Sequence, residues 1–475
     1  MSFNENNTCG GQNGYDGQNG SNEPYVSDEP TKSGDLTCGP IFKKLLALAI
    51  PMMGAQMVQM LYNLTDMFWL GRLGSGQLAA SGAVGMYMWL SVSPMLIGSI
   101  GASIGVAQSV GSGARDRAKT YAQTAFLLNA ALGAVYGLIM IVFNRQMIGF
   151  FAFREQEVAD AAGTYLMIVA IAFPLTYLSA VISSTFTAAG NSRVPFICNF
   201  IGMTLNMALD PLLIFTAGMG IGGAAAATAI GQAIVCALLF FMIKTHKNRP
   251  FEQIKFLVIP KTNDIKQILR WAIPTSVEGF LFTFLAMVTT RREAFFGADV
   301  MAISRVGSQI ESLTWLLGGA FGSALITFIG QNYGAQRWDR INETFRLASI
   351  ALLCYGALVC FIMLVPGIYI FKLFLPDPAL TDRSLAYLRI LAIAQIPMCM
   401  EGAASNTFRG LGRTTPPAIV NTSCNVLRVA FVYLFSMSVL GLNGIWIGIT
   451  ASHLVKGIWA YAWYVGAEKR RKPVV

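Results

Sequence analysis

The chain has 475 residues, of which 54% are hydrophobic and only 12% are charged. Because a soluble globular chain carries about 25% charged residues, this composition excludes an ordinary soluble domain. The net charge of +10 comes from basic residues in short loops between apolar segments, where they set membrane topology, and this placement argues against a nucleic-acid partner. The composition therefore predicts an α-helical protein that crosses a membrane many times.

Residues 1–38 differ from the rest of the chain because they are polar, acidic and rich in Gly and Asn. A segment with so little to bury predicts a disordered tail, which the topology below places in the cytoplasm. The start of the chain shows neither the charged nor the apolar region of a secretory signal peptide, so we expect none to be cleaved.

Twelve apolar segments follow, each long enough to supply the roughly 20 residues that cross a bilayer as a helix. The longest polar connection, residues 245–265, separates them six and six and predicts a cytoplasmic linker. We therefore expect an N-terminal bundle over residues 39–244, a C-terminal bundle over residues 266–467 and a basic cytoplasmic tail over residues 468–475. The predicted spans are 42–71, 83–111, 120–144, 161–188, 194–216, 222–245, 266–297, 305–333, 344–371, 384–408, 417–439 and 444–467.

The loops between these segments alternate in charge along the chain. If the N-terminus is cytoplasmic, most of the basic residues fall in inside loops, among them Arg115, Arg340 and Arg409. The positive-inside rule then places both termini in the cytoplasm of a multi-pass protein of the plasma membrane.

The two halves of the chain match each other in order when one is shifted by 222 or 223 residues along the other. Composition alone gives scattered identities, whereas ordered identities over this length indicate two homologous six-helix bundles. Because six is even, both bundles enter the membrane with the same orientation, as in transporters with parallel repeats, and a central cleft opens alternately to each side. Matched pairs include Gln108/Gln331, Gly111/Gly334, Arg117/Arg340, Tyr165/Tyr387, Gly190/Gly412, Asn199/Asn421 and Thr228/Thr450.

The predicted fold class is therefore an all-α membrane protein. Its twelve transmembrane helices form two homologous six-helix bundles, which are related by a pseudo-two-fold axis along the membrane normal.

Two acids lie inside apolar segments, where a carboxylate is costly and is by default a functional hypothesis. Asp66 follows Tyr62 by four residues, so the two share a helix face, with Asn63 close by. Asp210 follows Asn206 with the same spacing. A proline comes directly after Asp210 and leaves a backbone carbonyl without its helical partner, which is tolerated at membrane depth where the chain lines a cavity.

The repeat tests whether the fold itself requires these acids. Asp66 faces Thr289 across the repeat and Asp210 faces Val432, so the second half manages without them. This favours a functional role over a structural hydrogen-bonded acid. For Thr228, a hydroxyl in the sixth span, the test is neutral because a threonine stands opposite it, and helix packing and ion binding both stay open.

Two motifs resemble those of the MATE (multidrug and toxic compound extrusion) transporters. Residues 330–335, Gly-Gln-Asn-Tyr-Gly-Ala, resemble the family's GQNxGA signature, with residues 107–113 as their first-half counterpart. Residues 408–417 resemble its RGxGxTxxP segment. The settings of the two acids, Tyr-Asn-Leu-Thr-Asp and Asn-Met-Ala-Leu-Asp-Pro, look most like the DinF-type branch. The resemblance covers roughly residues 40–467 and implies a twelve-helix, V-shaped exporter driven by an inward H⁺ or Na⁺ gradient.

The resemblance also implies roles for individual residues. In the family resembled, one polar cluster in the N-terminal half binds the coupling ion and bends the first helix. The matching positions in this chain are Tyr62, Asp66, Asn206, Asp210 and Thr228.

The second half has acids of its own, notably Glu278 and Glu401. Some branches of the family place ion-binding acids on these two helices, but the spacing differs here, so no role is carried over. Glu278, Glu401 and Arg428 form a candidate second ion or substrate site. The alternative is that Glu278 pairs with an internal base such as Arg428 or Lys456.

These observations predict a secondary antiporter that exports amphipathic, cationic small molecules in exchange for H⁺ or Na⁺ by alternating access. We expect a functional monomer whose partners are its substrates and the membrane lipids. The alternative is a lipid-linked oligosaccharide or lipid flippase of the same superfamily, which calls for more arginines in the cleft than this sequence offers. We expect no enzyme, cofactor or metal site, because no catalytic set, phosphate loop or metal-ligand spacing occurs.

Overall fold

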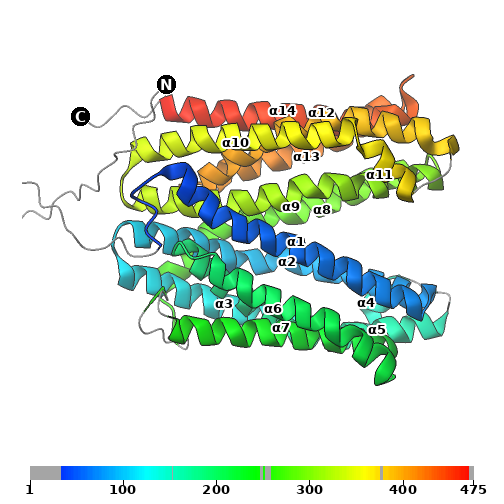
Figure 1. Cartoon of the computed structure of the whole chain (residues 1–475), viewed down its shortest axis with the longest axis horizontal. Coiled ribbons are helices and arrows are strands. Elements are labelled where there is room, and N and C mark those ends of the chain that lie inside the picture. The colour runs from blue at the N-terminus through cyan, green and yellow to red at the C-terminus, as the bar shows by residue number, and fades with distance from the viewer. Residues whose placement is uncertain are drawn as a thin grey trace, which may run out of the picture.

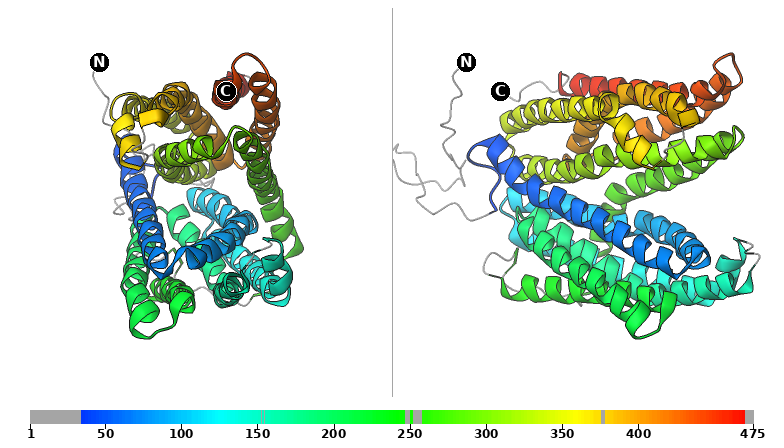
Figure 2. Two further views of the ribbon diagram at one scale, coloured as in Figure 1. Left: turned by 90° about the vertical axis from the view of Figure 1, so that its right-hand side faces the viewer. Right: turned by 45° about the vertical axis from the view of Figure 1, so that its right-hand side comes forward.

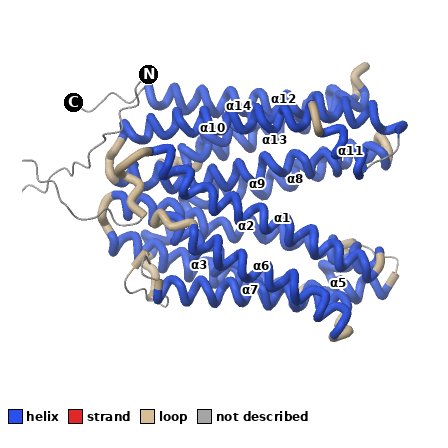
Figure 3. The backbone as a smooth tube through the Cα atoms, in the orientation of Figure 1, coloured by secondary structure: helices blue, strands red, loops and turns tan. Residues whose placement is uncertain are grey.

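The computed structural model describes residues 34–469 apart from 152, 154, 247–249, 252–257 and 375–377. Nearly all of these residues are helical, and none of them forms a strand (Figure 3). A chain in lipid satisfies its backbone hydrogen bonds most simply within helices, which explains this content. The first half comprises α1 (Ile41–Leu73), α2 (Ser75–Gly111), α3 (Arg115–Val142), α4 (Asn144–Gly149), α5 (Gln156–Ala188), α6 (Arg193–Pro211) and α7 (Gly220–Thr245).

The second half repeats this order of long and short helices. In the first half, a π-helical turn (Leu212–Thr216) continues α6. In the second half, a short 3₁₀ turn (Pro378–Leu380) precedes α12. The helices of this half are α8 (Thr262–Ala294), α9 (Ala298–Gly334), α10 (Trp338–Leu364), α11 (Gly367–Phe374), α12 (Thr381–Gly410), α13 (Thr415–Ser436) and α14 (Gly441–Lys469).

Twelve long helices confirm the predicted fold class. Within the described residues, eleven helices are long and apolar enough to cross a membrane. The twelfth, α14, has 29 residues but falls below that measure of apolarity, because it contains His453 and Lys456 near its middle.

Most of the predicted spans were too short at their ends. α2 begins at Ser75 rather than at residue 83, and α9 begins at Ala298 rather than at residue 305. Helical hydrogen bonding continues through polar residues that a hydropathy pattern excludes from the bilayer core. The short helices α4 and α11 were not predicted, and they begin 223 residues apart, at Asn144 and Gly367, so the internal repeat extends to them.

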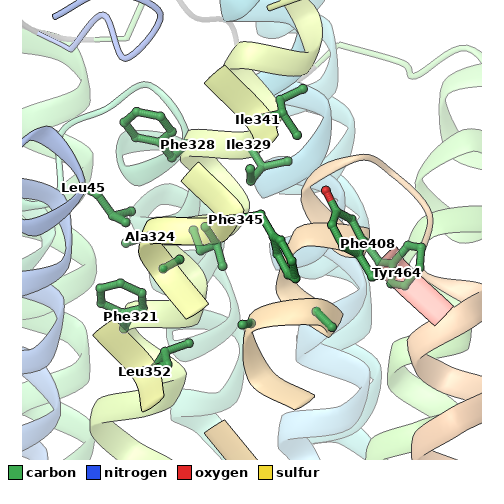
Figure 4. Packing of buried hydrophobic residues seen from close by; sticks show 14 of the residues in the cluster. Leu45, Phe321, Ala324, Phe328, Ile329, Ile341, Phe345, Leu352, Phe408 and Tyr464 are labelled. Carbon is green, nitrogen blue, oxygen red and sulfur yellow. The ribbon is translucent and has the colours of Figure 1, made fainter. Parts of the chain in front are cut away.

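The two halves touch at one end and diverge toward the other (Figures 1 and 2). We call the end where α2, α5, α9 and α12 terminate the closed end; α1 starts there and α14 ends there. Each half also receives the first turns of a helix from the other half. Leu45 and Leu48 of α1 belong to the same buried cluster as Phe328 of the second half, and Figure 4 shows Leu45 and Phe328 within it. Ile268 and Trp271 of α8 pack in the first-half core.

The end of the predicted disordered tail is ordered. Leu36 is only 5% exposed and belongs to the same buried cluster as Leu45. The prediction that residues 1–38 have nothing to bury is therefore wrong for this part, and residues 1–33 lie outside the described residues. A single apolar side chain in a polar stretch gives too weak a signal to indicate burial.

Candidate ion-coupling and substrate sites

Three helices of the first half bring polar side chains together at membrane depth. The Tyr62 hydroxyl of α1 lies 3.2 Å from the Thr228 hydroxyl of α7. Asp210, at the end of α6, is fully buried, and Asn206 lies one turn earlier on the same buried face. Asp66 of α1 is close enough to Asp210 for their charges to interact. The structure thus gathers the five residues that the resemblance grouped.

The cluster contains buried acceptors that no described residue satisfies. Asp66 Oδ1, Asn206 Oδ1 and both carboxylate oxygens of Asp210 have no hydrogen-bond partner among the described residues. A buried polar atom without a partner is rare and calls for an explanation. Two carboxylates that lie close together also repel each other, so a proton or a cation relieves both problems. The arrangement is an oxygen-lined site suited to H⁺ or to a hard cation.

The backbone beside Asp210 is irregular, as its following proline predicted. α6 ends at Pro211, and the chain continues through a π-helical turn, Leu212–Thr216. π-Helical turns are rare in proteins, and those that do occur often lie at functional sites. Gly223 of α7 lets this turn approach closely, because a Cβ there would crowd the Leu213 backbone.

Asn63 does not join this cluster. It is exposed, and its side-chain oxygen accepts a hydrogen bond of 3.2 Å from Gln59 on the same helix. Successive residues of an α-helix are rotated by about 100°, so the face that points Tyr62 and Asp66 inward turns Asn63 away. Its predicted place among the ion-coupling residues is therefore not supported by the geometry.

Sequence reasoning missed Tyr165 of α5. This residue is buried and lies close to both Thr228 and Asp66. The internal repeat offered a signal for Tyr165, because the corresponding residue of the second half is Tyr387. In the structure, Tyr387 donates a hydrogen bond of 2.5 Å to Glu311. A buried tyrosine at this position therefore lies beside a polar partner in both halves.

A comparison of Tyr62 and Asn63 tests this description of α1. Tyr62→Phe removes the hydrogen bond to Thr228 and is expected to lower stability by about 1 kcal/mol. Asn63→Ala, on the exposed face, is expected to change it by less than about 0.5 kcal/mol. Thermal unfolding in detergent measures both, and equal effects of the two substitutions would contradict the assigned faces.

The second half holds a cavity of about 340 Å³ lined by both candidate acids. Arg409 forms an ion pair of 3.0 Å with Glu278. The Asn421 amide donates to Glu278 at 2.7 Å and to Glu401 at 3.1 Å, and Ser405 donates to Glu401 at 2.5 Å. Glu278 and Glu401 therefore share one hydrogen-bonded network, as expected for two acids of the same candidate site.

The partner of Glu278 is not the predicted one. Sequence reasoning offered Arg428 or Lys456, and it counted Arg409 among the residues of a cytoplasmic loop. Arg409 instead lies in the last turn of α12, which continues to Gly410, and its side chain is only 16% exposed. Because α12 continues beyond the apolar segment, the Arg409 side chain reaches Glu278.

Arg428 lies apart from the two acids. Its guanidinium contacts Ser452 at 3.1 Å and His453 at 3.0 Å, and it stacks over the ring of Phe282. Among the described residues Arg428 forms neither an ion pair nor a hydrogen bond with Glu278 or Glu401. The charge that faces Glu401 across the cavity belongs to Lys456.

A smaller cavity of about 210 Å³ occupies the equivalent place in the first half, and Ala320 and Ser323 of α9 complete its lining. Its lining is polar but uncharged, with several serines. Five lining positions correspond through the repeat, so the charges of the second-half cavity are additions to a shared scaffold. The pairs are Ala55/Glu278, Gln56/Gly279, Ser184/Asn406, Thr187/Arg409 and Asn199/Asn421.

Two pseudo-symmetric helical bundles, with buried polar sites inside an apolar exterior, are the architecture of a multi-pass membrane transporter. The chain belongs to the MatE family, whose model matches residues 51–212 and again residues 274–434, once in each half. The chain is thus a MATE family transporter, as the motifs predicted.

Individual relatives agree with this family. The chain is 26% identical to a probable multidrug resistance protein NorM of Thermotoga maritima over 92% of its own length and 94% of the relative. It is 23% identical to an FAD transporter of Shewanella oneidensis over 90% and 95% of the two chains. A solved structure of a multidrug resistance MATE family transporter in an outward-facing conformation superposes with a TM-score of 0.87 at 22% identity, covering 94% of this chain and all of that one.

Proposed function

We propose that the protein is a secondary antiporter that exports amphipathic, cationic small molecules, including drugs and toxic compounds, in exchange for inward H⁺ or Na⁺. The observation that carries this proposal is the cluster around Asp66 and Asp210, in which Asp66 Oδ1 and both Asp210 carboxylate oxygens have no hydrogen-bond partner among the described residues. The names of curated relatives, several of them multidrug resistance or export proteins, support the substrate class. The basic loops support a plasma-membrane topology with cytoplasmic termini, and the protein acts as a monomer.

The mechanism follows from the charge of that cluster. Without a bound ion, the Asp66 and Asp210 carboxylates favour a cationic substrate in the cleft. When H⁺ or Na⁺ enters, it neutralises the cluster and changes the packing of α1, which carries both Tyr62 and Asp66. The substrate then loses affinity and leaves. The ion drives this step only through its different affinity for the two conformations.

The second-half cavity supplies a site for the substrate or a second ion. Phe282, Trp315 and Met398 line it beside Glu278 and Glu401. Aromatic and methionine side chains offer an adaptable apolar wall, and the acids offer a counter-charge to a cation.

The flippase alternative calls for a cleft that attracts a large anionic headgroup. One relative is named for a transported anionic cofactor, FAD, and Arg409 and Lys456 line the second-half cavity. Each base, however, has an acid opposite it, Glu278 for Arg409 and Glu401 for Lys456. This balance favours export of cations over transport of anionic lipids.

Transport by the purified protein in liposomes tests the proposal. We expect uptake or release of a lipophilic cation when a pH gradient or a Na⁺ gradient is imposed separately, with one of the two sufficient. An anionic substrate such as FAD serves as the comparison. Transport that needs neither gradient, or that favours FAD over the cation, contradicts the proposed antiport.

A further inference from the structure

The two halves are tied together at the closed end by a pair of equivalent glutamines. Gln108 of α2 donates from its side chain to the Gly410 carbonyl of α12 at 3.0 Å. Gln331 of α9 donates to the Ala188 carbonyl of α5 at 2.9 Å. Each bond joins one half to the other, and the repeat relates the two donors and the two acceptors. We call these two bonds the glutamine seal.

The seal rests on direct contact between the ends of α2 and α9. A Cβ at Gly111 would overlap the Gln331 carbonyl, and a Cβ at Gly334 would overlap the Gln108 carbonyl. Only glycine allows this approach of two backbones. Opening of the molecule at this end must therefore separate these helix ends and break both glutamine bonds.

Residues 34–39 reinforce one of the two glutamine bonds, the one made by Gln331. The Leu36 N–H donates to the side-chain oxygen of Gln331 at 3.0 Å. The Leu36 carbonyl accepts from Asn332 at 3.3 Å and from the Arg340 guanidinium at 3.2 Å. Gln331 is thus held from both ends of its amide, by Leu36 on one side and by the first half on the other.

The same segment also touches the first half. Gly34 lies directly against the backbone of Ala189 and Gly190, at the turn between α5 and α6. Residues 34–39 therefore bridge both halves at the closed end.

Arg340 is the main anchor of this segment. It is only 2% exposed and donates to the Gly39 carbonyl at 3.0 Å, to the Leu36 carbonyl and to Asn332 at 3.1 Å. Its counterpart in the repeat, Arg117, is exposed, and among the described residues its guanidinium hydrogen-bonds the Tyr121 hydroxyl, at 3.4 Å, and lies over the ring of the same residue. The fold does not require a buried arginine at this position. We therefore attribute the burial of Arg340 to residues 34–39, the segment that it binds.

We propose that residues 34–39 are a latch, anchored by Arg340, that holds Gln331 in the position that seals the closed end. The latch rests on the alternating access of the proposed function, because it must release before the molecule can open on this side. It makes Arg340, Leu36 and Gln331 positioning residues for transport, although none of them lies in the two polar sites.

Hydrogen exchange of the full-length protein in detergent or nanodiscs tests the latch. Arg340→Gln is expected to speed exchange about tenfold in residues 106–113 and 186–191, which belong to the other half. The loss of a hydrogen bond to a charged group changes an opening equilibrium by about this factor, and exchange follows that equilibrium. A merely local role of Arg340 would affect residues 331–340 alone.

Two further variants keep the test independent of the stability of Arg340→Gln. Leu36→Pro removes the N–H that binds Gln331 and is expected to speed exchange in the same two segments. Arg117→Gln makes the same chemical change at the exposed counterpart and is expected to leave them unchanged. Faster exchange confined to residues 34–40 and 331–340, or spread evenly over all helices, overturns the latch. The measurement needs no transport, so it stands apart from the liposome test of the proposed function.

Discussion

Replacement of Asp66 or Asp210 by asparagine is expected to abolish gradient-driven efflux while the protein still folds. Asparagine keeps the size of the side chain but cannot exchange a proton, and it weakens the attraction for a cation. The second half lacks acids at the corresponding positions, Thr289 and Val432, so the fold tolerates their loss. Efflux of a fluorescent lipophilic cation from liposomes under an imposed ion gradient measures the effect.

The control for this prediction makes the same change on the surface. Asp160 is exposed and accepts a hydrogen bond from Gln156 on α5. Asp160→Asn should leave efflux at the level of the unchanged protein. If both buried variants transport as well as this control, the Asp66/Asp210 cluster does not couple transport to the ion.

Arg409→Gln is expected to destabilise the second half by about 3 kcal/mol, because breaking a largely buried ion pair leaves an uncompensated charge. Glu278 is 13% exposed and receives both the Arg409 guanidinium and the Asn421 amide. Glu278→Gln together with Arg409→Gln should recover much of that loss, since no unpaired charge remains. Thermal unfolding of the single and double variants in detergent gives the coupling between the two residues.

Arg413→Gln provides the matched control, because Arg413 lies four residues later and is exposed. It should change stability by less than about 0.5 kcal/mol. Additive losses in the double variant would indicate that Glu278 and Arg409 do not stabilise each other, and the second-half cavity would then need another explanation.

Much of the fold could be predicted because its signals lie along the chain. Apolar length indicates a membrane helix without knowledge of its neighbours, and ordered identities between the halves indicate two equivalent bundles. The helix ends were less accurate, as at α2 and α9, because backbone hydrogen bonding continues past the apolar residues. The short helices α4 and α11 gave no such signal and became visible only as repeat-related elements in the structure.

The candidate site was predicted in part. The i, i+4 spacing placed Tyr62 with Asp66 and Asn206 with Asp210, and the structure brings both pairs into one cluster. Helix rotation excludes Asn63, and Tyr165 enters from a helix that sequence reasoning had not connected to the site. Their roles in ion coupling remain predictions for the experiments above.

The sequence by itself determined that this protein spans the membrane as two homologous bundles and that two acids lie where the fold does not need them. These properties depend on composition, spacing and internal repetition, which the linear chain displays. The tertiary structure alone decided that Arg409 pairs with Glu278 and that the Leu36 N–H donates a hydrogen bond to Gln331. Such partners are separated by more than a hundred residues, and only the tertiary packing of the chain brings them within hydrogen-bond distance.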